Sequence, residues 1–176
     1  MGKTRALRKT ARCYPERTDR KPARVLDARV LGDGLRAGAV AGLLSGAPST
    51  FDALRRGTDP LAAARAAGNL LLPAGSGPGP LLAAGAAAHV ALSLGWGTVL
   101  AVALRRTPRP PVVAGALAGA AIAALDLGLL AHGPAGRRWP LIRALPVGPQ
   151  LADHVAFGAI AGAVLAFREA GRRRHH

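Results

Sequence analysis

The chain has 176 residues, half of them hydrophobic but only 3% aromatic, and its formal net charge is +15. A water-soluble core would use more bulky side chains, whereas Ala, Gly, Val and Leu suit membrane helices that approach closely. The charge lies in the termini and between apolar runs, which disfavours a nucleic-acid-binding surface, and Cys13 as the sole cysteine excludes an internal disulfide or thiolate cluster.

Residues 1–30 are expected to form a disordered, basic cytoplasmic tail. They contain ten Lys or Arg residues and almost no apolar clustering, so burial cannot offset the entropy of ordering them. They also lack the apolar stretch of a cleavable signal peptide, so we expect the later helices to direct membrane insertion. We expect this tail, and the basic C-terminal tail at 170–176, to contact anionic lipid headgroups.

Four apolar segments predict an all-α polytopic membrane protein, a four-transmembrane-helix bundle over residues 31–169. The clearest segment is 81–104, whose 24 residues carry no permanent charge and could cross roughly 30 Å of hydrocarbon. The other spans are expected at about 34–54, 111–131 and 150–167. With both termini cytoplasmic, seventeen Lys or Arg residues lie inside and six outside, and this bias favours four spans over three.

Two local features are expected to shape the first half of the bundle. Asp33 is expected to cap the start of the first span. Pro48 is expected to bend that span, so that the part beyond Gly46 is either a kinked last turn or a segment shifted into the membrane interface. Asp59 and Pro60 then open an apolar stretch at about 60–72 that is too short to span. We expect an interfacial helix there.

Glycines recur every four residues in three of the predicted spans, within GAVAG, GALAG and GAIAG. Such spacing gives a smooth face for close helix packing. The glycines are Gly38, Gly42, Gly115, Gly119, Gly158 and Gly162. Together with His-Val-Ala at 89–91 and 154–156, the motif indicates either a duplicated two-helix unit or the shared composition of Ala/Gly-rich helices.

Polar residues within the predicted spans form the candidate site. With the N-terminus inside, the ionisable ones fall in the outer half of the membrane, and we expect a polar intramembrane cluster: His89, Ser93, Asp126, Asp153, His154 and Asp52. A structural or partner-binding membrane protein is the favoured interpretation. The alternatives are translocation of a proton, an ion or a small solute, and an enzyme acting on lipid.

The sequence offers little support for an enzyme. No spacing matches a metal-binding motif, and there is no serine in a nucleophile elbow and no pair of catalytic carboxylates. We therefore assign no catalytic residue, no metal and no cofactor. The expected partners are the lipid bilayer and either a second copy of the chain or another membrane protein, and no nucleic acid is expected.

Residues 33–168 resemble the small, uncharacterised four-helix integral membrane proteins of high-GC bacteria. The resemblance rests on Ala88-His89, on Trp96 and on the Asp-His-x-x-Phe-Gly pattern at 153–158. It implies a four-helix fold and a location in the bacterial inner membrane. It carries over no catalytic residue.

Overall fold

The computed structural model describes residues 27–174, and within this range the chain is helical with no strand. Residues 1–26 and 175–176, which hold most of the predicted basic tail and the last two histidines, lie outside the described part. In chain order the elements are α1 (Ala28–Leu44), α2 (Ala47–Arg55), α3 (Ala62–Gly68), α4 (Pro78–Leu104), α5 (Pro111–Ala123), the π-helix η1 (Ala124–Ala131), the 3-10 helix η2 (Pro134–Arg138), α6 (Pro140–Arg143) and α7 (Val147–Arg173).

Three helical stretches are long and apolar enough to cross a membrane: α4, Pro111–Gly128 and α7. By length and composition the chain is therefore a multi-pass membrane protein. The predicted first span at 34–54 is not among them, because the helix is interrupted. Its first part, α1, has 17 residues and rises only about 26 Å, less than the roughly 30 Å hydrocarbon core.

The interruption of the first helix lies at Ser45 and Gly46, with α2 starting directly afterwards. Pro48 has no N–H and sits at the second position of α2, where a helix does not need one. The start of α1 differs from the prediction as well. Asp27, not Asp33, caps the helix by accepting a hydrogen bond from Val30 N at 2.8 Å, and Asp33 lies inside α1.

The predicted interfacial helix at about 60–72 is shorter than expected, because α3 covers only Ala62–Gly68. Asp59 Oδ1 does accept a hydrogen bond from Leu61 N at 2.9 Å just before it. The helix packs directly on α4: a Cβ added to Gly68 or to Gly85 would lie closer than 3.0 Å to the opposite backbone. α3 is therefore held against the first turns of α4 by close backbone contact.

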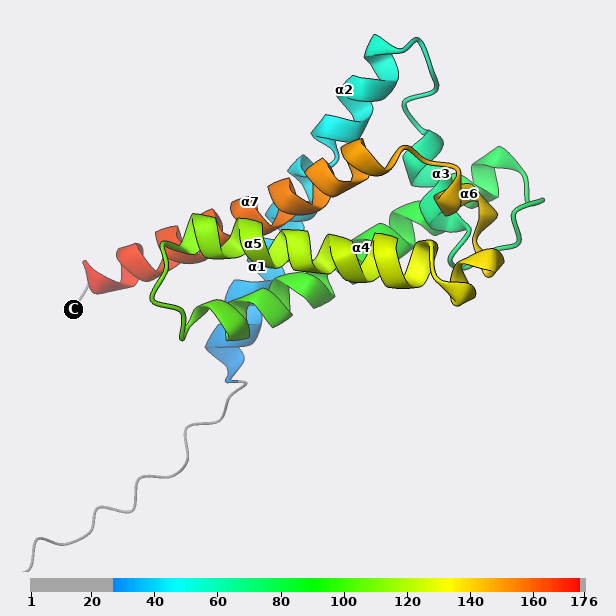
Figure 1. The fold of residues 1–176 in the computed structure, drawn as a ribbon. Helices are drawn as coiled ribbons and strands as arrows, with labels where there is room; N and C mark the ends of the chain where they lie inside the picture. Colours follow the sequence, from blue (N-terminus) through cyan, green and yellow to red (C-terminus); the bar gives the residue numbers. More distant parts are fainter. Residues whose placement is uncertain (1–26, 175–176) are drawn as a thin grey trace, which may run out of the picture.

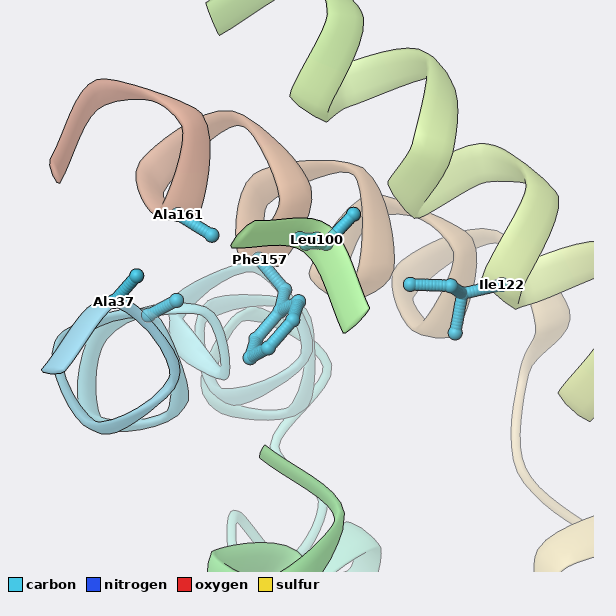
Figure 2. Packing of buried hydrophobic residues seen from close by; sticks show 6 residues of the cluster. Ala37, Leu100, Ile122, Phe157 and Ala161 are labelled. Atoms are coloured by element: carbon cyan, nitrogen blue, oxygen red, sulfur yellow. The ribbon is translucent and has the colours of Figure 1, made fainter. Parts of the chain in front are cut away.

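The main helices pack as two antiparallel pairs, α1 with α4 and α5 with α7, and α1 also contacts α7 (Figure 1). Figure 1 also shows α2 projecting from the bundle beside the first turns of α7. Buried side chains from all four helices meet in one core, and Figure 2 shows five of them labelled: Ala37, Leu100, Ile122, Phe157 and Ala161. Trp96 packs against this core from α4.

The two helix pairs repeat the same backbone contacts. Gly38 of α1 faces the carbonyl of Ser93, and Gly115 of α5 faces the carbonyl of Gly158, in each case with less than 3.0 Å of room for an added Cβ. The positions correspond when α1 is matched to α5 with an offset of 77 residues and α4 to α7 with an offset of 65.

Further equivalent contacts follow the same two offsets. Gly42 faces His89 and Ser93, while Gly119 faces His154, which is the equivalent of His89. Gly97 and Gly162 are equivalent too, and each is followed by x-Val-Leu-Ala. Shared composition alone would not place equivalent residues in equivalent contacts, so the packing favours a duplicated helix pair.

Candidate functional site: polar contacts around the helix break

His89 of α4 contacts the end of α1. Its Nε2 lies 2.8 Å from the carbonyl oxygen of Gly42, which belongs to the last turn of that helix. Carbonyls in a last turn have no partner within their own helix, and a carbonyl can only accept, so the imidazole donates from Nε2. His89 therefore satisfies a backbone acceptor that the break exposes.

Asp153 of α7 contacts the start of α2. Its Oδ1 accepts a hydrogen bond from the backbone N–H of Ser49 at 2.9 Å. Ser49 is the third residue of α2, where the N–H groups lack an intrahelical acceptor and the helix dipole favours a negative charge. Asp153 does not cap its own helix, because α7 already begins at Val147, and its carboxylate caps α2 instead.

Asp126 and His154 form the third contact. His154 Nδ1 lies 2.8 Å from the carbonyl oxygen of Gln150 and therefore donates to it. His154 Nε2 lies 3.4 Å from Asp126 Oδ2, a long contact. Since a neutral imidazole that donates from Nδ1 can only accept at Nε2, this contact needs one further proton, either on the carboxyl group or on the ring.

Asp126 lies in η1, where the backbone changes from α-helical to π-helical geometry. The end of η1 shows the wider turn, since His132 N donates to Leu127 O, five residues back. Single π-turns occur frequently at functional sites. The sequence gives no signal for η1, because its eight residues are apolar apart from Asp126.

The remaining predicted polar residues occupy different surroundings. Ser93 is buried on α4 and packs against Gly42, close to His89. Asp52 does not join the cluster, because it pairs with Arg56 at 2.9 Å along α2 itself. The structure thus brings His89, Ser93 and Asp153 to the helix break and places Asp126 with His154 beside it.

A polar network that the sequence did not indicate lies at the opposite end of the bundle. Asp33 of α1 is buried and pairs with Arg168 and with Arg172 of α7, the latter at 2.6 Å. Burial would raise the pKa of the Asp33 carboxyl, but the two arginines outweigh it and hold that pKa below the ordinary value. More than 130 positions separate the partners, so only the packing of α1 on α7 could reveal the network.

The site can donate and accept protons and can satisfy backbone groups. Within residues 27–174 no three His, Cys, Asp or Glu side chains are grouped so that they could hold a metal ion. In the same part of the chain every buried side-chain nitrogen or oxygen has a hydrogen-bond partner. The polar residues are thus engaged with the protein itself.

Over residues 27–174 the chain is all-helical, and by length and composition it is a multi-pass membrane protein in which His89, Ser93 and Asp153 gather at an interrupted helix. Comparisons with protein-family models, with curated proteins and with solved structures give no match.

Proposed function

We propose that this chain is a structural or partner-binding protein of the bacterial inner membrane, in the four-helix family that its sequence resembles. The interrupted helix α1–α2 counts as the first of four spans, and both termini face the cytoplasm. The observation that supports this role is the use of His89 and Asp153: each binds a backbone group that the break would leave unsatisfied.

The energetics of a membrane favour this interpretation. An unsatisfied backbone group in hydrocarbon costs several kcal/mol, so an interrupted helix is tolerated only where other groups replace its lost hydrogen bonds. A lone charged side chain costs about 2.5–3.5 kcal/mol even on lenient insertion scales. Placing the polar side chains at the break reduces both costs, and it fixes α1, α4 and α7 relative to one another.

Partners follow from this architecture. The bilayer surrounds the apolar faces of α4, α5 and α7, and anionic headgroups neutralise the basic termini. A rigid bundle with no reaction of its own would act by binding a second copy of itself or another membrane protein.

The orientation can be tested with reporter fusions in two connecting loops. Position 76 precedes α4, and position 107 follows it. Alkaline phosphatase should be active when fused at 76 and inactive when fused at 107. The reverse pattern would contradict cytoplasmic termini, and activity at both positions would contradict a span between them.

A second candidate function is movement of a proton, an ion or a small solute. The observation in its favour is the contact between His154 and Asp126, which requires a proton that could be passed on. Asp153 adjoins His154 in the chain, and His89 is near enough to Asp153 to interact with it electrostatically. These groups belong to three helices.

One substitution separates the two functions. Asp126→Asn keeps the shape of the side chain and removes its negative charge. If the residue is structural, the variant loses about 1 kcal/mol of stability in detergent and nothing else. If it is part of a proton path, pH-driven uptake into reconstituted vesicles is abolished. Asp52→Asn is the matched control, because the carboxylate of Asp52 pairs with Arg56, four residues further along the chain, and not with His154.

A further inference from the structure

A cavity of about 210 Å³ opens at the end of the bundle where α1 and α5 begin and α4 and α7 end. It lies at the opposite end from the helix break and shares no residue with the polar contacts described there. All four helices line it, and the lining includes Ala101 and Ala166, which occupy equivalent positions in the two helix pairs. The cavity therefore sits where the two halves of the chain meet.

The lining of this cavity carries three basic and three acidic side chains: Arg29, Arg105 and Arg172 with Asp27, Asp33 and Glu169. Two further arginines, Arg168 and Arg173, do not line the cavity but pair with acidic residues of its wall. With these two included, five arginines surround three carboxylates.

The three carboxylates are already engaged, whereas two of the arginines have no ion-pair partner among the residues that the structure describes. Asp27 caps α1, Asp33 pairs with Arg168 and Arg172, and Glu169 pairs with Arg173. Arg29 and Arg105 form no ion pair within residues 27–174. They come from different helices, so the cavity offers two guanidinium groups to one anion.

The two arginines of α7 that pair with Asp33 have no arginine counterpart at the equivalent positions of the other helix pair. Ala103, near the end of α4, and Thr107, in the turn that follows it, hold the positions that correspond to Arg168 and Arg172. The glycine contacts that both helix pairs share account for the packing within each pair, and this packing does not depend on the arginines of α7. The charged wall of the cavity is therefore an addition to the repeated fold.

We propose that this cavity binds a phosphate group. Arginine recognises phosphate through planar, paired hydrogen bonds. Arg29 and Arg105, which have no ion pair within the described part of the chain, could hold its oxygens from two sides. The phosphate could belong to an anionic lipid headgroup or to a free phosphate ion. The proposal rests on the proposed membrane location only if a lipid supplies the phosphate.

The test uses the full chain, purified in a neutral detergent and studied by titration calorimetry. Short-chain phosphatidylglycerol, short-chain phosphatidylcholine and inorganic phosphate are titrated separately. We expect saturable binding of phosphatidylglycerol or of inorganic phosphate, and whichever ligand binds identifies the source. Arg29→Gln and Arg105→Gln should each weaken binding about tenfold, the effect of losing one charge-assisted contact.

Arg106→Gln is the matched control, because Arg106 is the neighbour of Arg105 and does not line the cavity. Its affinity should equal that of the wild type, and circular dichroism should show that all three variants keep their helix content. Equal weakening by all three would indicate a diffuse basic surface and overturn the proposal. So would the lack of saturable binding of both phosphatidylglycerol and inorganic phosphate. Cell fractionation tests the membrane location separately, so either proposal can fail alone.

Discussion

The contact between α1 and α4 leaves no room for a side chain at Gly97, while Gly95, two residues earlier on α4, faces open space. A Cβ at position 97 would lie 2.5 Å from the carbonyl oxygen of Gly34, where ordinary contact requires at least 3.4 Å. The obstructing atoms belong to the backbone, so no side chain can move aside. Gly97→Ala therefore forces the two helices apart by about 1 Å, because a close-packed interface has no spare volume for the added methyl group.

The two substitutions should consequently act in opposite directions. Overpacking of this kind costs about 1–3 kcal/mol, so Gly97→Ala should lower the free energy of unfolding by that amount. Gly95→Ala adds a better helix former in open space and should raise the free energy of unfolding by up to about 1 kcal/mol. At about 3 °C per kcal/mol for a chain of this size, the two melting temperatures should differ by several degrees.

The assay is unfolding in mixed detergent micelles, followed by far-ultraviolet circular dichroism. Circular dichroism is preferable to tryptophan fluorescence, because Trp96 lies between the two substituted positions. Equal stability of the two variants, within about 0.5 kcal/mol, would refute the close contact of α1 with α4. A greater loss at Gly95 than at Gly97 would refute it as well.

Two further predictions concern polar contacts at the two ends of the bundle. His89→Ala should lower the free energy of unfolding by about 1–2 kcal/mol, because the carbonyl of Gly42 loses its donor. A hydrogen-exchange measurement should show faster exchange of the backbone amides around the break. Unchanged exchange there would contradict the role of His89. Asp33→Asn should lower stability by about 1–2 kcal/mol at pH 7, because Arg168 and Arg172 lose their carboxylate. Since the folded-state pKa of Asp33 is lowered, its contribution is present above about pH 4 and lost as the pH falls further, so wild type and variant should converge only in acid.

The helical class could be predicted from the sequence because a membrane span is a local property. Length and hydropathy over some twenty residues identify 81–104, 111–131 and 150–167, and the three candidate spans of the structure contain or largely overlap these segments. The interrupted helix was signalled too, since Pro48 follows Gly46 within two residues. The sequence did not show that the break would remove this segment from the set of candidate spans.

Contacts between distant residues could not be predicted in the same way. Which polar group meets which depends on the crossing angle and register of two helices, and neither is encoded in a local window. The pairing of Asp33 with Arg168 and the capping of α2 by Asp153 both depend on α7 packing against the first helical segments. The glycine spacing did carry register information, because only glycine permits backbones this close.

The break between α1 and α2 also has a consequence for biosynthesis. The carbonyl of Gly42 finds its donor 47 residues later in the chain, and the N–H of Ser49 finds its acceptor 104 residues later. At about 5–20 residues per second, His89 leaves the ribosome about 2–9 s after Gly42, and Asp153 leaves it about 5–20 s after Ser49. Until α7 has been synthesised, the start of α2 therefore lacks the carboxylate that caps it. In the proposed four-span topology, this delay favours a position of α2 at the lipid headgroups until α7 is present.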